Sequence, residues 1–292
     1  MNCFYISDID RNKKNFFIYN VGVNMAEKTI WQKPDHLGKR IGMSLFGVVI
    51  CAISVGFFKV AAFGVDPFQA LMAGLDKIIP DVNILLFGKE INLTSFGTLY
   101  VIVNAILFIF MLVFDRHYIG IATFINLFLL GYITEFTLSK LTAFLMANPN
   151  TVILSTEGAA VGIVLWARII CIVIGIVVIC IGSAFYMTAD LGVSTYDAVA
   201  LIISNTWKKG KFFYVRIITD VICVIIGVGL LILALYNNDG LSLSNREHAL
   251  TIGKEIFAIA GIGTIITAFF MGPLIEVFNT IWAKPFLYGK EK

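Results

Sequence analysis

Long apolar runs alternate with short polar stretches along most of this chain. We interpret six of them as membrane-spanning helices, at about 41–65, 96–114, 118–138, 161–188, 213–236 and 255–282. About 20 apolar residues cross the hydrocarbon core of a bilayer, and these runs are too long and too apolar for ordinary core helices. The pattern therefore predicts an all-α polytopic membrane protein with six transmembrane helices.

Two shorter segments, 67–79 and 194–206, follow the first and fourth predicted spans. The first begins just after Gly64 and the second just after Gly192, and each glycine is expected to interrupt the helix before it. Both segments are too short to cross a bilayer. We expect them to be half-helices that are re-entrant or lie at the membrane interface.

Composition agrees with this interpretation. Hydrophobic residues make up 59% of the chain and charged residues only 14%, with a mean hydropathy of +0.88. Soluble domains contain about 25% charged residues. The net charge of +3 needs no nucleic-acid partner, because the basic residues are distributed as membrane orientation requires.

With both termini in the cytoplasm, fifteen basic residues lie in predicted cytoplasmic segments and five in external ones. The cytoplasmic set is Arg11, Lys13, Lys14, Lys28, Lys33, Lys39, Arg40, Arg116, Lys208, Lys209, Lys211, Arg216, Lys284, Lys290 and Lys292. The external set is Lys77, Lys89, Lys140, Arg246 and Lys254. This asymmetry satisfies the positive-inside rule.

The predicted organisation has five parts. They are a cytoplasmic tail at 1–40, a first membrane repeat at 41–140, an external linker at 141–160, a second repeat at 161–282 and a cytoplasmic tail at 283–292. Residues 1–24 are polar and irregular. Either the tail is unusually long or the true start lies downstream of them, and we favour the second interpretation.

The chain contains an internal duplication. Residues 57–70 align with 185–198 at a shift of 128, with five identities in fourteen positions. Residues 120–131 align with 261–272 at a shift of 141, and the match continues from Glu135 to Glu276. The difference between the shifts fits a longer 237–254 loop. Three spans in each copy predict inverted repeats, an architecture of secondary transporters whose sites lie where helices break.

These two motifs resemble the YczE/YyaS/YitT family of bacterial membrane proteins. The resemblance rests on Ala189-Asp190-Leu191-Gly192-Val193-Ser194-Thr195-Tyr196-Asp197 and on Gly261-Ile262-Gly263-Thr264 running on to Gly272-Pro273-Leu274-Ile275-Glu276. It departs from the family at Thr195, where a proline is usual, and at Glu276, where an Asp is usual. Over about 40–282 it implies a bacterial cytoplasmic membrane protein, and it implies no particular chemistry.

Charged residues at membrane depth are costly and mark candidate functional positions. The candidates for substrate or ion binding are Asp66, Asp190, Asp197, Asp220, Glu135, Glu276, Lys59 and Arg168. For Asp66 and Ser194, capping of a half-helix would be a sufficient explanation. Glu135 and Glu276 would equally suit lipid headgroups, and Lys59 could either snorkel to the interface or pair with an acid.

Glycines at matching positions form a second group of candidates. Those expected at helix breaks or close helix contacts are Gly64, Gly192, Gly120, Gly131, Gly261 and Gly272. The two copies differ in charge, because Lys59 aligns with Met187, Gln69 with Asp197 and Asn104 with Asp220. The acids are concentrated in the second copy, so a site is expected there.

These features predict a secondary transporter or permease for a small molecule, with its site near the helix breaks. The chain has no G-x-x-x-x-G-K-[ST] loop, so ion coupling or facilitated passage is expected. No catalytic grouping, metal site or cofactor site is recognised, and an enzyme is not expected. The alternative is an accessory or regulatory protein of a larger membrane complex. Association with copies of itself and association with another membrane protein are both left open by the sequence.

Overall fold

The computed structural model describes residues 36–80, 83–86, 89–92, 95–154, 160–210, 212–237, 240–241 and 245–289. All of them belong to one compact unit, Lys33–Lys292. Residues 1–24 lie outside the described residues, so the expectation about the start of the chain is not tested. The two predicted tails and the predicted linker are described only in part.

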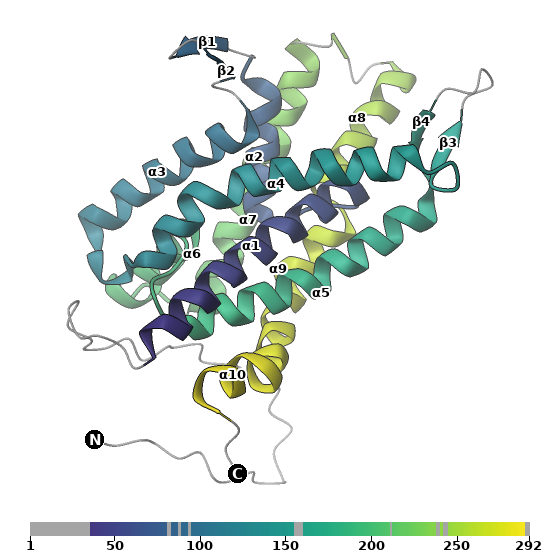
Figure 1. The fold of residues 1–292 in the computed structure, drawn as a ribbon. Helices are drawn as coiled ribbons and strands as arrows, with labels where there is room; N and C mark the ends of the chain where they lie inside the picture. The colour runs from purple at the N-terminus through teal and green to yellow at the C-terminus, as the bar shows by residue number, and fades with distance from the viewer. Residues whose placement is uncertain are drawn as a thin grey trace, which may run out of the picture. The chain divides into compact units, whose positions relative to one another are not determined.

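Helices dominate the described chain (Figure 1). The longer helices are α1 (Leu37–Ala61), α2 (Pro67–Ile78), α3 (Phe96–Phe114), α4 (Ile121–Ala147), α5 (Leu165–Ala189), α7 (Phe212–Asn237), α8 (Arg246–Ile259) and α9 (Ile262–Phe278). The shorter ones are η1 (Arg116–Tyr118), α6 (Thr195–Leu201), η2 (Ile202–Thr206), η3 (Asn279–Ala283) and α10 (Lys284–Tyr288). The described residues also form four strands, namely β1 (Asn83–Leu86), β2 (Lys89–Asn92), β3 (Val152–Leu154) and β4 (Ala160–Ile163).

Six helical stretches among the described residues are long and apolar enough to cross a membrane. Five are single helices, and the sixth extends over Arg246–Tyr288. The prediction of a helical protein with six stretches able to cross a membrane is confirmed by their length and composition. The short segments after the first and fourth spans are helices α2 and α6, as the sequence predicts.

The sixth span, predicted as one continuous helix over 255–282, is interrupted in the structure. Helix α8 ends at Ile259, and α9 begins at Ile262 after a break at Ala260 and Gly261. A Cβ at Gly261 would lie 2.4 Å from the Phe257 carbonyl oxygen of α8 and 2.5 Å from the Phe63 carbonyl oxygen, so a tertiary contact accompanies the break. Helix α8 also occupies much of the segment that the sequence interpretation assigns to a loop.

Two short antiparallel hairpins, β1–β2 and β3–β4, are further departures from the all-α prediction. Strand β3 lies in the predicted 141–160 linker, and β4 extends from the end of that linker into the predicted second repeat. The first residues of the linker instead extend α4 to Ala147. Strands of three or four residues carry too little periodicity to be recognised in a sequence.

Helix α1 lies between α4 and α5 (Figure 1), and small residues allow the close contacts. A Cβ at Gly47 of α1 would lie 2.6 Å from the carbonyl oxygen of Gly182 of α5. A Cβ at Gly56 would lie 2.7 Å from the Thr137 side chain of α4. Inside a bilayer the hydrophobic effect does not drive helices together, so their association relies on close contacts of this kind.

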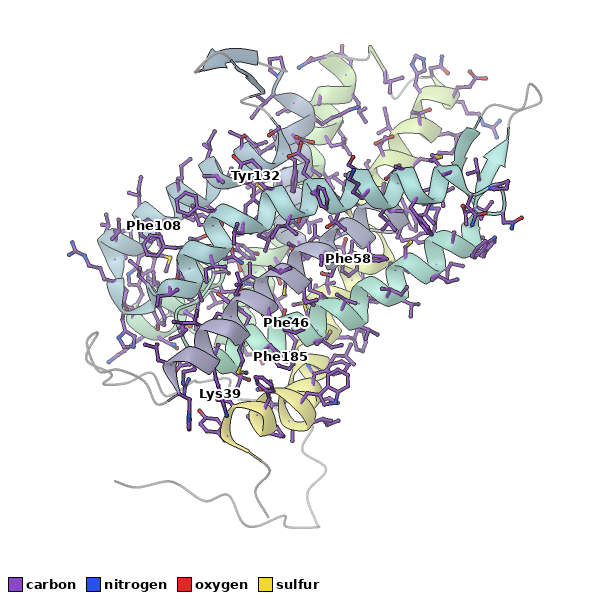
Figure 2. The ribbon with its side chains drawn as sticks, viewed as in Figure 1. Lys39, Phe46, Phe58, Phe108, Tyr132 and Phe185 are labelled. Atoms are coloured by element: carbon purple, nitrogen blue, oxygen red, sulfur yellow. The ribbon has the colours of Figure 1, made fainter. Side chains whose placement is uncertain are left out.

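Aromatic side chains distinguish the interior of the bundle from its surface. Phe58 of α1 is completely buried (Figure 2). Phe46 of α1 and Phe185 of α5 contact each other, with ring centroids 5.3 Å apart. Large apolar side chains such as Val113 (71% exposed) and Ile225 (65%) stay exposed on the outer helices. Exposure of this kind over many helices is typical of a lipid-facing surface.

Two glycines on α7 provide a test of close packing. A Cβ at Gly227 would lie 2.4 Å from the carbonyl oxygen of Ala70 on α2, whereas a Cβ at Gly229 would meet nothing within 4 Å. We expect Gly227→Ala to destabilise the protein by about 1–3 kcal/mol because the two backbones must separate. Gly229→Ala should be neutral or slightly stabilising. Thermal unfolding in detergent micelles measures both, and equal losses would contradict the packing explanation.

Candidate functional site

The break after α1 is hydrogen-bonded to the start of α9. Gly64 has a φ of 101°, which favours glycine. The Phe63 carbonyl accepts a hydrogen bond from the Gly263 amide (2.7 Å), and the Val65 amide donates to the Ile259 carbonyl (3.3 Å). The backbone groups freed by the break are therefore satisfied by α8 and α9 rather than by water.

The break after α5 makes the same contacts with the start of α4. Gly192 has a φ of 106°. The Leu191 carbonyl accepts from the Ala122 amide (3.0 Å), and the Val193 amide donates to the Tyr118 carbonyl (3.2 Å). Under the two sequence shifts, each of these hydrogen bonds corresponds to one at the first break.

Four of the six candidate glycines meet in two pairs at these breaks. A Cβ at Gly64 would lie 2.6 Å from the Gly261 amide nitrogen, and a Cβ at Gly192 would lie 2.5 Å from the Gly120 amide nitrogen. Gly131 instead packs against the Tyr100 side chain. Gly272 differs from the rest, because a Cβ there would meet nothing within 4 Å. The expected close packing is therefore absent at Gly272, although the sequence match includes it.

Both half-helices begin at the expected caps. The Asp66 carboxylate accepts a hydrogen bond from the Gln69 amide (3.2 Å) at the start of α2. The Ser194 hydroxyl accepts from the Asp197 amide (3.0 Å) at the start of α6. Each bond satisfies one of the amides that a helix leaves unpaired at its first turn.

The starts of α2 and α6 lie against each other. The rings of Phe68 and Tyr196, which are matching residues of the two copies, stack with centroids 4.8 Å apart and planes inclined by 21°. Tyr100 of α3 packs edge-on against Phe68 at 5.8 Å. The tertiary structure therefore brings two segments that are far apart in the sequence into one buried aromatic contact.

An arginine cluster lies beside this contact, and we define it as Tyr196, Asp197, Arg216 and Asp220. The Arg216 guanidinium forms an ion pair with Asp197, approaches Asp220 at 3.3 Å and lies over the Tyr196 ring, 4.3 Å from its centroid. The Tyr196 hydroxyl donates to the Asp220 carboxylate. Asp66 interacts electrostatically with Arg216 from the other half-helix.

Burial within the arginine cluster is uneven. The Asp220 side chain is only 6% exposed, whereas those of Asp197 and Arg216 are 24% and 29% exposed. Asp197 also accepts a hydrogen bond from the Ser194 hydroxyl (2.7 Å). The cluster therefore joins the N-terminal end of α6 to the first third of the spanning helix α7, at a position that is partly accessible.

Three of the eight charged candidates, Asp66, Asp197 and Asp220, are thus brought together. Sequence reasoning missed Tyr196 and Arg216 as members of the site. Arg216 was assigned to a cytoplasmic segment, and the signal that could have found it is its position four residues before Asp220 on one helix face. Tyr196 could have been found from its alignment with Phe68.

Other candidates lie elsewhere. The Lys59 ammonium lies 2.9 Å from the centroid of the Phe96 ring and interacts electrostatically with Glu135. Glu135 accepts from the Gly97 amide (3.2 Å) at the start of α3. Glu276 forms an ion pair with Lys284 (3.1 Å) near the end of the described chain. Neither glutamate is part of the arginine cluster.

The last two candidates lie at the ends of the interrupted helices. Arg168 of α5 donates to the carbonyl oxygens of Ala61 (2.7 Å) and Ala62 (2.8 Å), where α1 ends. Asp190 is the residue that ends α5, in a left-handed conformation with a φ of 50°. Arg40, which the sequence interpretation places in the tail, donates to the Ala189 carbonyl (2.9 Å).

Metal binding has no support in the described part of the chain, where no group of three or more His, Cys, Asp and Glu residues could hold an ion. What the arrangement offers chemically is an exchangeable ion pair. Carboxylates of α6 and α7 pair with one guanidinium, and a cation or a proton can compete with that guanidinium for them.

Removing the guanidinium tests the cluster. We expect Arg216→Leu to cost about 3–5 kcal/mol, because it leaves carboxylates buried without a counter-charge. Adding Asp197→Asn and Asp220→Asn to this variant should recover most of the loss. Arg116→Leu is the control, since its side chain is exposed and donates to the Leu112 carbonyl near the end of α3. Thermal unfolding in micelles measures all variants, and no recovery in the triple variant would contradict the charge argument.

Comparison with known proteins agrees with the resemblance found in the sequence. No solved structure matches the chain. "Uncharacterized protein YyaS" of Bacillus subtilis (strain 168) is 25% identical over 242 residues, which cover 82% of this chain and 92% of that protein. The model of a family of unknown function, DUF6198, matches residues 38–280, which include all six apolar stretches almost completely. This protein therefore belongs to the DUF6198 family.

Proposed function

We propose that this protein is a secondary transporter or permease for a small molecule, with its site at the arginine cluster and the adjoining starts of α2 and α6. The observation that carries the proposal is the convergence of two interrupted spans on one polar site, with Asp66 and Asp197 on the two half-helices. Interrupted helices that meet in this way are characteristic of secondary transporters.

We further propose that the two halves are inverted repeats. The support is the matching set of hydrogen bonds at the two breaks. In each case the break of one half binds the third span of the other half, so the halves are interlocked at the proposed site. An axis lying in the membrane plane would exchange them, which is the symmetry used for alternating access.

The charge balance favours a cation as the substrate or the coupling ion. Arg216 forms ion pairs with Asp197 and Asp220, and Asp66 adds a third carboxyl group nearby. An excess of negative charge is costly inside a membrane, and a proton or another cation would offset it. Ion coupling also agrees with the lack of a nucleotide-binding loop in the sequence.

The proposed location is the bacterial cytoplasmic membrane, with both termini in the cytoplasm. The distribution of basic residues supports this orientation, because fifteen of them are assigned to inner segments, although Arg40 and Arg216 among them lie within helices α1 and α7. We expect alkaline phosphatase fused after residue 289 to be inactive and the same enzyme fused after Asn150 to be active. Activity of the first fusion would contradict the orientation, and a green fluorescent protein fusion at residue 289 provides the converse readout.

Transport itself is tested in proteoliposomes with a trapped pH-sensitive dye. Amino acids, polyamines and other organic cations are supplied in turn, with and without a proton gradient. We expect Asp197→Asn to lower the flux of any accepted compound about tenfold or more, because the carboxylate that faces Arg216 loses its charge. Glu276→Gln, outside the arginine cluster, is the matched control. If no compound moves and the protein instead co-purifies with a stoichiometric partner, the accessory-protein alternative replaces this proposal.

A further inference from the structure

Arg40 and Arg168 make the same contact in the two halves of the chain. Arg40 lies in the first turn of α1 and donates to the Ala189 carbonyl at the end of α5 (2.9 Å). Arg168 lies in the first turn of α5 and donates to the Ala61 carbonyl at the end of α1 (2.7 Å). The shift of 128 that aligns the helix breaks also aligns Arg40 with Arg168 and Ala61 with Ala189.

The carbonyls that these arginines bind need a partner. Ala62 follows the last residue of α1 and Asp190 follows that of α5, each with a φ of 50°. The last turn of each helix therefore has carbonyl groups without an intrahelical donor. Water cannot satisfy such groups inside a bilayer, and the C-terminal end of a helix carries partial negative charge. A guanidinium supplies both several donors and a permanent positive charge.

Aromatic rings hold the two guanidinium groups in place. Arg168 lies 4.5 Å from the centroid of Phe63, the residue that precedes the first break glycine. Arg40 lies 5.9 Å from the centroid of Tyr288 in α10 and also donates to the Tyr288 hydroxyl (3.1 Å). Arg40 is only 5% exposed. The Arg40 contact is therefore shielded from solvent, whereas Arg168 is only half-buried.

The two contacts lie at opposite ends of one helix pair. Arg40 meets the end of α5, Gly47 contacts Gly182, and Arg168 meets the end of α1, so α1 and α5 run antiparallel along their whole length. Each arginine binds the residues immediately before a break. Loss of one contact would loosen the break at that end and leave the other break bound.

We propose that Arg40 and Arg168 are a matched pair of positioning residues that hold the two helix breaks closed, one at each end of the α1–α5 pair. Release of one arginine at a time opens one side of the proposed site. The alternate opening of the two sides rests on the proposed transport function. The role of each arginine in holding its break does not depend on that function.

The test measures the accessibility of each break separately. All five cysteines are replaced, and one reporter cysteine is introduced by Val65→Cys or by Val193→Cys, matching positions just after the two break glycines. Labelling by a water-soluble maleimide is then followed in micelles. We expect Arg168→Ala to accelerate labelling at position 65 about tenfold and to leave position 193 unchanged, because local opening is confined to one break.

Arg40→Ala should give the reverse pattern. Arg246→Ala, at an exposed residue in the first turn of α8, is the control and should change neither rate. If an alanine variant does not fold, the Arg→Lys variants replace it, since lysine keeps the charge but makes fewer hydrogen bonds, and the same side-selective pattern is expected at smaller amplitude. Acceleration at both positions by either variant, or at neither, would overturn the proposal.

Flux measurements on the same variants separate the two proposals. Side-selective labelling in a protein that transports none of the compounds supplied would leave the holding role intact and reject the transport function. Flux that survives in both arginine variants, with labelling unchanged, would reject the holding role and leave the transport function intact.

Discussion

The rest of this structure depends on one constraint, namely that an interrupted helix inside a bilayer must satisfy its backbone without water. Two helices, α1 and α5, end in left-handed residues and continue as extended chain before α2 and α6 begin. The freed amides and carbonyls bond to the starts of α4 and α9, which belong to the opposite halves of the chain. This exchange explains why Gly64 and Gly192 face Gly261 and Gly120, since a side chain at any of them would separate the backbones.

The same exchange places the polar residues. Because each break is bound to the other half, the starts of α2 and α6 are brought together, and Phe68 stacks on Tyr196. Arg216 then meets carboxylates from its own helix and from α6, with Asp66 nearby. The two halves are alike in backbone contacts but unlike in charge, because Gln69 occupies the position that matches Asp197. A common framework thus carries one asymmetric polar site.

The arginines at the helix ends extend this argument. Membrane helices seldom place arginine beside apolar residues unless it has partners, and here the partners are backbone carbonyls at the ends of α1 and α5. The two contacts differ in their surroundings, since α10 covers Arg40 through Tyr288, whereas Arg168 packs on Phe63. The aromatic partner of Arg40 therefore comes from the C-terminal helix α10, whereas that of Arg168 comes from the helix break itself.

The sequence by itself determined the class of protein, the approximate spans, the helix breaks and the match between the two halves. These follow from local properties, because the length of an apolar run and the conformational freedom of glycine require no knowledge of distant residues. It also identified Asp66, Asp197 and Asp220 as candidates, since charge in an apolar run is visible without a fold. Only the tertiary structure decided that these three converge, that Glu276 pairs with Lys284 instead, and that Arg40 belongs with Arg168. The interruption between α8 and α9 was equally hidden, because the Phe63 backbone that bonds to it comes from a distant part of the chain.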